Sequence, residues 1–227
     1  MSSLPKDDRF ARQRDLVPPE RLAPRAVSVI GCGAIGRPVA LQLAALGVRR
    51  LQLVDFDRVA ATNVTTQGYR AADVGRLKVD ALAADLRALE PALELDLVPE
   101  RWRPRIPLGD VVFACVDAIA TRAALWRGGG DVVPSWFDGR MRGETVRILA
   151  AYDGPTRAHY ATTLFPPAEA QRGACTSRST IYAASVAAGL LVGQFVKRLR
   201  GLPVAPDLVL NLLADELAPL DAGRPSA

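Results

Sequence analysis

The sequence is poor in the side chains that bind metals or form disulfides. Its 227 residues include one histidine, His159, and three widely separated cysteines, Cys32, Cys115 and Cys175. A structural zinc site needs about four nitrogen or sulfur ligands, often in Cys-x-x-Cys pairs, and the sequence has no such pair. An odd number of distant cysteines also argues against a disulfide framework. We therefore expect no zinc and a reduced, cytoplasmic setting.

Lysines and long apolar runs are also scarce. All but three of the 29 basic residues are arginine, and they are scattered rather than striped, at a formal net charge of +5. Without an interleaved aromatic platform this charge favours anionic ligands or an acidic protein partner, so we expect no nucleic-acid partner. The chain begins without an apolar signal segment. The apolar run of the helix expected at 180–199 is shorter than the ~20 residues of a membrane span. We expect a buried helix there, in which Gly189 and Gly193 allow close packing, and no membrane partner.

The hydrophobic content of 49% is enough to bury a core, and the apolar residues follow a strand–helix alternation. This pattern predicts an α/β fold: a Rossmann-like, mainly parallel sheet flanked by helices, with an antiparallel C-terminal continuation. We expect one domain over 26–215, after an arginine-rich arm (1–25) and before a tail (216–227). The expected strands are 27–31, 50–55, 93–98, 110–115, 132–138, 145–152 and 207–213; the helices are 35–47, 77–90, 119–127 and 180–199; the long loops are 56–75 and 153–179.

A glycine-spaced turn follows the first expected strand and is the strongest single motif. Gly31 permits the tight turn, Gly33 lets phosphate oxygens approach the backbone, and Gly36 lets the next helix pack close to the strand. That helix begins with free N–H groups for an anion. The second strand ends in Asp55, with Asp57 close behind, where an acid binds ribose hydroxyls. The layout predicts a nucleotide site, although a turn without a ligand has the same spacing.

Several further segments, in order along the chain, extend this pattern. They are Arg9-Phe-Ala-Arg12-Gln13, the stretch from Asp55 to Gln67, Asp73-Val-Gly75-Arg-Leu-Lys78, Cys115-Val-Asp117 with Arg122, and Cys175 before the Ala/Gly-rich helix. Together they resemble the ubiquitin-activating-enzyme superfamily, in particular its ThiF/MoeB members. The resemblance implies a homodimer that uses ATP and Mg²⁺ to adenylate the C-terminal glycine carboxylate of a small ubiquitin-fold carrier protein.

The resemblance also implies roles for individual residues. Lys78 contacts the phosphates, Asp117 holds Mg²⁺, Asp55 with Asp57 binds the ribose, and Asn63 hydrogen-bonds the phosphates. Gln67 closes the same nucleotide-binding segment. Arg12 reaches across the dimer to the partner's phosphates, and Cys175 attacks the acyl-adenylate to form a thioester.

A simpler interpretation stays open for each of these residues. Arg12 is alternatively a solvated charge, Asp57 a turn residue, Lys78 an exposed helix start, and Asp117 an N-cap of the helix at 119–127. Asn63 is alternatively a loop residue bonded to its own backbone. Cys175 is alternatively a small buried residue, as we expect for Cys32 and Cys115. His159 is expected to be structural or to lie at the surface, because no carboxylate partner can be named for it.

The sequence departs from the family pattern in two places. Thr66 stands where the family has an arginine, so Arg58, Arg70 or Arg76 would have to replace one phosphate-facing cation. The two zinc-binding Cys-x-x-Cys pairs of many relatives are also absent. Two rival functions therefore remain open: an NAD(P)-dependent oxidoreductase, which shares the glycine turn, and a nucleotide-binding dimeric scaffold without turnover.

Overall fold

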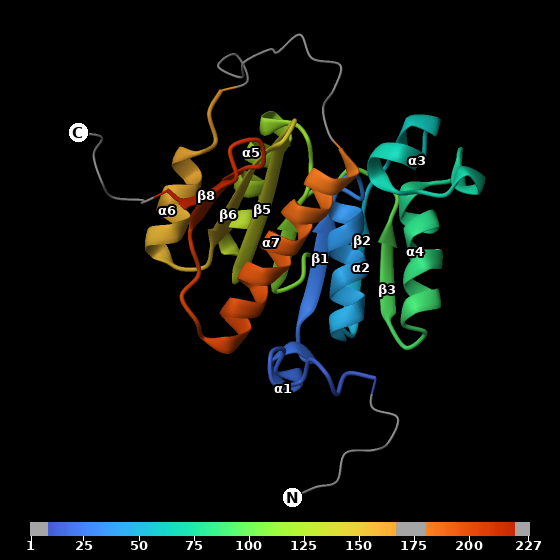
Figure 1. The fold of residues 1–227 in the computed structure, drawn as a ribbon, viewed down its shortest axis with the longest axis horizontal. Coiled ribbons are helices and arrows are strands. Elements are labelled where there is room, and N and C mark those ends of the chain that lie inside the picture. The colour runs from blue at the N-terminus through green and yellow to red at the C-terminus, as the bar shows by residue number, and fades with distance from the viewer. Residues whose placement is uncertain (1–8, 167–179, 221–227) are drawn as a thin grey trace, which may run out of the picture.

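The computed structural model describes residues 9–166 and 180–220, which form one eight-stranded sheet covered by helices (Figure 1). The strand order is β3-β2-β1-β4-β5-β6-β7-β8. Strands β1 to β5 pair in parallel, and β6 to β8 continue the sheet antiparallel. This arrangement confirms the predicted Rossmann-like α/β fold with an antiparallel C-terminal continuation. The strands are β1 (Ala26–Ile30), β2 (Arg50–Val54), β3 (Glu94–Val98), β4 (Val111–Ala114), β5 (Ser135–Arg142), β6 (Thr145–Ala151), β7 (Asp207–Asn211) and β8 (Glu216–Pro219).

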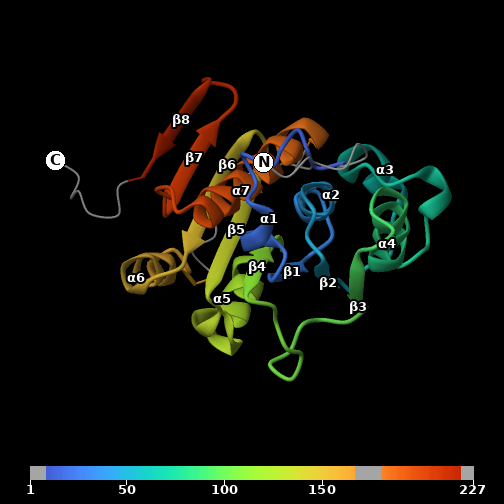
Figure 2. The ribbon, with the colours of Figure 1, turned by 90° about the horizontal axis from the view of Figure 1, so that it is seen from below.

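The helices form two layers, one on each face of the sheet (Figure 2). Helices α2 (Gly36–Leu46), α4 (Lys78–Leu89) and α7 (Ile181–Arg200) cover one face, and α5 (Ile119–Gly128) and α6 (Gly154–Thr162) lie on the other. Each layer encloses its own hydrophobic cluster, the larger under α2, α4 and α7 and the smaller around Trp126, Trp136 and Tyr160. The remaining short elements are α1 (Pro19–Leu22), α3 (Ala61–Gln67), η1 (Ala71–Asp73) and η2 (Gly130–Val132).

Three stretches differ from the expectation. The stretch expected as a loop at 56–75 contains α3, whose polar and β-branched residues are not buried and so show no apolar period. Within the expected loop 153–179, α6 begins at an Asp153 N-cap that accepts a hydrogen bond from the Thr156 N–H. In the expected tail, β8 pairs with β7 after a turn at Asp215. Residues 167–179 lie outside the described part of the chain.

The described part of the N-terminal segment packs against the body rather than extending from it. Val17 and Leu22 are buried, Gln13 Nε2 donates to Ala45 O at 3.0 Å, and Arg21 Nη1 donates to Leu199 O at 2.8 Å. The segment therefore lies at the end of the molecule where α2 and α7 finish (Figure 1). None of the helices in the described ranges is long and apolar enough to cross a bilayer.

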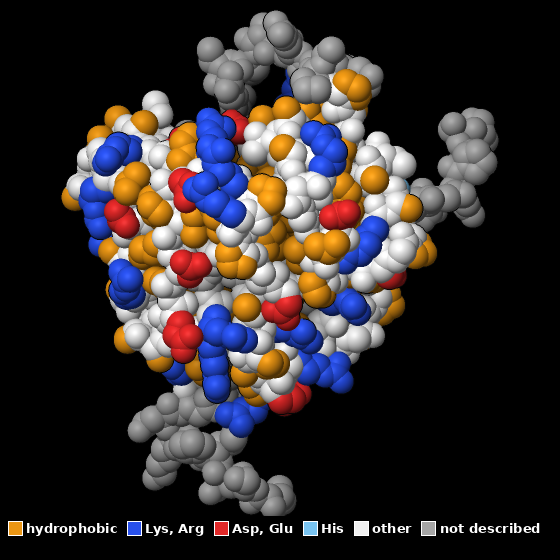
Figure 3. All heavy atoms as spheres, turned by 180° about the vertical axis from the view of Figure 1, so that it is seen from behind, with side chains coloured by type: hydrophobic (Ala, Val, Ile, Leu, Met, Phe, Trp, Pro, Cys, Tyr) orange, Lys and Arg blue, Asp and Glu red, His pale blue; other side chains and the backbone are white. Residues whose placement is uncertain are grey.

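Basic side chains do not merge into one stripe on the rear face (Figure 3). They lie there in separate groups, with acidic side chains between them. The expected scatter of arginines therefore extends to this surface.

Candidate nucleotide site

The glycine turn lies between the ends of β2 and β4. Gly31 has φ +92°, its N–H donates to Val54 O at 2.8 Å, and a Cβ there would lie 2.7 Å from Cys115 O. A Cβ on Gly36 would lie 1.7 Å from Gly31 O. Both glycines are therefore required by the chain itself, as the sequence predicts for the turn and the close packing.

Gly33 is different, because nothing in the described chain requires it. A Cβ at Gly33 would meet only the Gln67 side chain, with its Oε1 3.8 Å away. Gln67 Oε1 is itself buried without a hydrogen-bond partner among the described residues. A bare backbone position beside an unpaired amide oxygen suits a ligand that brings its own polar atoms close to the turn.

The two acids at the end of β2 have different environments. Asp55 is 8% exposed, and its carboxylate accepts the Cys32 N–H at 2.7 Å and the Asp57 N–H at 2.8 Å. Burial raises the pKa of Asp55, and these backbone hydrogen bonds oppose that rise. Asp55 thus ties the strand end to the glycine turn, while Asp57 reaches outward from the same strand end.

Lys78 is the first residue of α4 and is almost fully buried. Its Nζ lies 3.0 Å from Asp57 Oδ2, with side-chain exposures of 8% for Lys78 and 48% for Asp57. This burial contradicts the alternative interpretation, in which Lys78 starts the helix on its exposed face. A buried ammonium whose one described partner is a half-exposed carboxylate can also pair with an anion arriving from solvent.

Helix α3 carries Asn63 and Thr66, one turn before and next to the Gln67 side chain that lies beside Gly33. Asn63 Oδ1 accepts the Ala60 N–H at 2.9 Å, which is the local bonding of the simpler interpretation and leaves the amide NH₂ as a donor. Thr66 Oγ1 donates to Thr62 O at 2.7 Å within the helix.

None of the three arginines considered as substitutes for the missing cation bonds toward the turn in the described structure. Arg58 Nη1 donates to Gly75 O at 2.8 Å, Arg70 pairs with Asp85, and Arg76 pairs with Asp73. Among the described residues, each of the three is instead bonded to another part of the chain.

Asp117 follows β4 on the opposite side of the glycine turn from Asp55. The segment that carries it contacts the turn at Cys115 and Val116. Asp117 is exposed, and the N-cap of α5 is Ala118, so the alternative N-cap role is wrong. No group of three His, Cys, Asp or Glu side chains suited to a metal occurs in residues 9–166 and 180–220. A single carboxylate agrees with the way Mg²⁺ binds, through one or two carboxylates, waters and substrate phosphates.

The remaining predicted residues do not join this site within the chain. Arg12 is exposed on the N-terminal segment, at the opposite end of α2 from the glycine turn. Cys175 lies outside the described residues. Burial raises the pKa of the thiols of Cys32 and Cys115, which accords with the structural role expected for both.

Two buried carboxylates, one on β5 and one on β7, were not singled out from the sequence. Asp138 is 0% exposed and binds Arg122, Arg140 and the Tyr160 hydroxyl at 2.8, 2.8 and 2.9 Å. Burial raises its pKa, but the two guanidinium groups overcome this and hold the pKa below its ordinary range. The available signal was an acid inside the apolar run Trp136-Phe137-Asp138.

The second carboxylate belongs to Asp207 and supplies the partner that the sequence did not reveal for His159. His159 Nε2 lies 2.8 Å from Asp207 Oδ2, and Arg147 binds both oxygens of the same carboxylate. These contacts join α6, β6 and β7, so the structural role expected for His159 agrees with its place.

Comparison with known proteins identifies a family and several relatives. The model of the ThiF family matches residues 13–217. The mouse protein "Adenylyltransferase and sulfurtransferase MOCS3" is 40% identical over 134 residues, covering 53% of this chain and 29% of that protein. The yeast protein "tRNA threonylcarbamoyladenosine dehydratase 2" is 32% identical over 115 residues, covering 47% and 26%. The chain thus spans less than a third of either relative.

Solved structures share the fold at low sequence identity. E. coli MccB crystallised with ATP superposes with a TM-score of 0.74 at 17% identity, covering 97% of this chain and 73% of MccB. PaaA superposes with a TM-score of 0.74 at 20% identity, covering 96% and 84%.

Proposed function

The chain belongs to the ThiF family, and we propose that it is an ATP-dependent adenylyltransferase acting on the C-terminal glycine carboxylate of a small ubiquitin-fold carrier protein. The observation that supports this most is the meeting of three groups at one edge of the sheet. The glycine turn lies between the Lys78–Asp57 pair and Asp117, and it contacts the ends of both β2 and β4. A relative that is an adenylyltransferase and a fold neighbour crystallised with ATP point to the same chemistry.

The arrangement suits a reaction between two anions. A carboxylate oxygen of the carrier bonds to the α-phosphorus of ATP, the bond to the bridging oxygen breaks, and pyrophosphate leaves to give an acyl-adenylate. The attacking carboxylate is already ionised at neutral pH, so no general base is needed. The free N–H groups at the start of α2 and the Lys78 ammonium would stabilise the phosphate charge. Mg²⁺, when bound, neutralises phosphate charge, and Asp117 would hold it.

Nucleotide binding tests the site before a carrier is known. We expect Mg·ATP to raise the melting temperature, since a ligand at 100 times its Kd stabilises a fold by about 2.7 kcal/mol. Lys78→Ala and Asp117→Ala should remove this shift, whereas Asp131→Ala, an exposed acid on η2, should keep it. A shift with NAD or NADP alone would make the protein an oxidoreductase, and no shift with any nucleotide would favour the scaffold.

Turnover is tested by pyrophosphate release with a carrier ending in Gly-Gly. Lys78→Ala should lower the rate by about 10²- to 10³-fold, as removal of one electrostatic group does in other active sites. Carrier-independent release, or an unchanged rate in Lys78→Ala, would contradict the proposal.

We further propose two finer features of the reaction. The protein acts as a homodimer in which the partner's Arg12 completes the phosphate site, because Arg12 cannot reach the site of its own chain from the far end of α2. Cys175 then takes the acyl group: its thiolate sulfur bonds to the carbonyl carbon, and AMP leaves. A carrier adduct that dithiothreitol releases, present in the wild type and absent in Cys175→Ser, tests the thioester. Adenylation without any such adduct would leave Cys175 outside the reaction.

A further inference from the structure

Tyr69 is a buried tyrosine whose hydroxyl bonds to the glycine turn. The residue is 2% exposed, and its hydroxyl donates to Cys32 O at 2.7 Å. The same hydroxyl lies 3.4 Å from Lys78 O at the start of α4. Tyr69 stands between the two family motifs that end at Gln67 and begin again at Asp73. One phenol outside those motifs therefore touches two segments of the candidate nucleotide site.

The peptide unit between Cys32 and Gly33 is bonded at one end and open at the other. A trans peptide unit is planar, so its C=O and N–H groups point in opposite directions. The C=O of this unit accepts the Tyr69 hydroxyl, whereas the Gly33 N–H donates to no residue in the described ranges. The hydroxyl therefore turns the Gly33 N–H away from Tyr69 and leaves it as a donor for a ligand.

The backbone groups on either side of this peptide unit are already bonded. The Cys32 N–H donates to Asp55 Oδ2 at 2.7 Å, and Gly33 O accepts the Arg37 N–H at 3.0 Å. Between these fixed points, the bond from Tyr69 is the one hydrogen bond that the described residues make to the Cys32–Gly33 unit. A phosphate oxygen that approaches Gly33, where no Cβ stands in its way, meets the open N–H.

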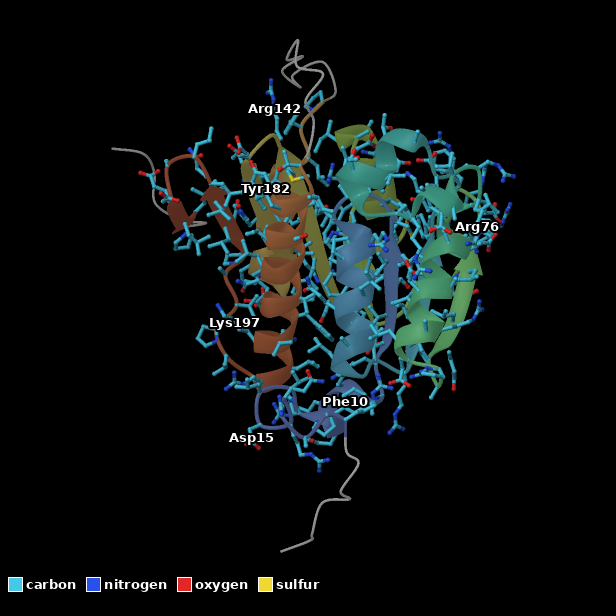
Figure 4. The ribbon with its side chains drawn as sticks, turned by 45° about the vertical axis from the view of Figure 1, so that its right-hand side comes forward. Phe10, Asp15, Arg76, Arg142, Tyr182 and Lys197 are labelled. Carbon is cyan, nitrogen blue, oxygen red and sulfur yellow. The ribbon has the colours of Figure 1, made fainter. Side chains whose placement is uncertain are left out.

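The phenol is itself held in place by its neighbours. Gly68, at φ +73°, turns the chain between the end of α3 and Tyr69. The Arg37 guanidinium lies over the Tyr69 ring, 5.1 Å from its centroid, and its Nη2 pairs with Asp85 Oδ2 at 2.8 Å. Figures 1 and 4 show α3 at the end of the molecule where α2 and α4 begin. The ring is therefore fixed by contacts from both helices that flank the nucleotide turn.

We propose that Tyr69 is a positioning residue of the nucleotide site, whose hydroxyl holds the Cys32–Gly33 peptide in the orientation that offers the Gly33 N–H to a phosphate. This role rests on the proposed function, because the ligand is ATP. Without the hydroxyl, Cys32 O loses its hydrogen-bond partner among the described residues. The peptide is then free to rotate, and a carbonyl oxygen turned toward the phosphates repels them.

Tyr69→Phe removes one oxygen atom and tests this role by binding. We expect its Kd for Mg·ATP, measured by isothermal titration calorimetry, to rise by about tenfold or more, because a hydrogen bond to a charged group is lost. The Kd for adenosine, measured by ligand-observed NMR because its binding is weaker, should stay at the wild-type value. Adenosine has no phosphate and therefore does not need the Gly33 N–H.

Tyr160→Phe is the matched control. Tyr160 is likewise buried, and its hydroxyl donates to Asp138 Oδ2 at 2.9 Å in the other helix layer. Both variants should lower the urea midpoint, because each leaves a buried acceptor with one hydrogen bond fewer. Tyr160→Phe should nevertheless bind Mg·ATP with the wild-type Kd, which separates a loss of stability from a loss of phosphate binding.

Three results would overturn the proposal. Unchanged Mg·ATP binding in Tyr69→Phe would show that the hydroxyl serves only the fold. An equal loss of Mg·ATP and adenosine would show that the whole site had changed, and equally weakened Mg·ATP binding in Tyr160→Phe would trace the effect to stability.

The binding comparison needs no carrier protein, so it can fail separately from the proposed function. A wild type that binds Mg·ATP but releases no pyrophosphate with a carrier would contradict the proposed function, while the two tyrosine variants still decide the role of Tyr69. A wild type that binds no Mg·ATP would overturn both.

Discussion

The carboxylates at the end of β2 have a different environment from those on β5 and β7. In the parallel half, Asp55 is held by two backbone N–H groups, and Asp57 stands half exposed beside Lys78. On β5 and β7, Asp138 and Asp207 are fully buried, and each binds two cationic or basic side chains. The end of β2 therefore orients acids at an edge that solvent reaches, whereas the acids of β5 and β7 are internal ties that hold strands and helices together.

The comparison separates sites for ligands from sites for stability. A fully buried carboxylate that binds two cationic or basic side chains is closed to a substrate, and removing it leaves buried charges unpaired. A carboxylate fixed through backbone N–H groups holds a loop in place and leaves nearby side chains open to ligands. We therefore expect substitutions of the buried acids on β5 and β7 to affect stability and those at the end of β2 to affect ligand binding.

The largest expected effect on stability comes from Asp138→Ala. It leaves Arg122 and Arg140 without their buried partner, and Arg122 is only 5% exposed. Breaking such a pair from one side costs about 3–5 kcal/mol. Urea denaturation at pH 7 measures this loss, with the exposed Asp131→Ala as control. A cost below about 1 kcal/mol, the usual value for an exposed pair, would show that Asp138 is not an internal tie.

Two glycines of the nucleotide turn, Gly36 and Gly33, offer the same contrast between a residue needed for the fold and one needed for a ligand. Gly36→Ala should destabilise the fold by about 3 kcal/mol, because the new Cβ would lie 1.7 Å from the carbonyl oxygen of Gly31 and the backbone must move. Gly33→Ala should leave the melting temperature within a few degrees, because its Cβ meets only the end of Gln67. The Mg·ATP shift should nevertheless fall in Gly33→Ala. Equal loss of stability in both variants would mean that Gly33 serves the fold and not a ligand.

Much of the fold was predictable because its strongest signals are local. Apolar runs and helical periods located β1, β2, β4, α2, α4 and α7 to within a few residues. Helix α3 was missed because tertiary placement, an Asn63 cap and Gly68 at φ +73° define it rather than an apolar stripe. Helix α6 did carry a local signal, Asp153 followed by Pro155 and Thr156, that the loop assignment overlooked.

The part of the candidate site that backbone geometry defines was predictable from the sequence. The roles of Gly31 and Gly36 follow from the turn, and the segment with Asp117 follows from parallel strands ending at one edge. The Asp138 and Asp207 clusters were not predictable, because Arg122, Arg140, Arg147 and His159 meet them only through tertiary structure. Sequence spacing does not specify such pairings.

Acid stability should separate Asp138 from Asp55, because their pKa values move in opposite directions. The pKa of Asp138 is lowered by Arg122 and Arg140 against its burial, so its stabilisation is complete above the unfolded value of about 3.9 and is lost as pH falls through the lower folded value. The pKa of Asp55 is raised by burial, so its ionised form costs stability at neutral pH. This cost is relieved as pH falls through the raised folded value toward about 3.9.

Urea denaturation of Asp138→Asn and Asp55→Asn between about pH 3 and pH 6 measures this contrast. Relative to wild type, Asp138→Asn should lose less stability below pH ~4. As pH falls toward that range, the wild type should regain the stability that the ionised Asp55 costs, and Asp55→Asn should not. Asp55→Asn should also be less stable at every pH, because the amide has one acceptor oxygen fewer for the backbone N–H groups. Parallel profiles for the two variants would show that the two carboxylates do not differ in environment as the contacts indicate.

The smallest expected effect is at His159, because Asp207 is also bound by Arg147. Asp207 keeps both oxygens bound to Arg147 when the imidazole is removed, so no buried charge loses its last partner. His159→Ala should therefore cost about 1 kcal/mol, the typical net value of one hydrogen bond. Arg147→Ala leaves Asp207 with the histidine alone and should cost more, because a fully buried carboxylate then lacks its bidentate cation. Denaturant midpoints of the two single variants and of the double variant measure both the order and the coupling. If His159→Ala costs as much as Arg147→Ala, the imidazole is an essential partner of Asp207. The contrast between buried acids that hold the fold and acids at the end of β2 that face a ligand would then not describe Asp207.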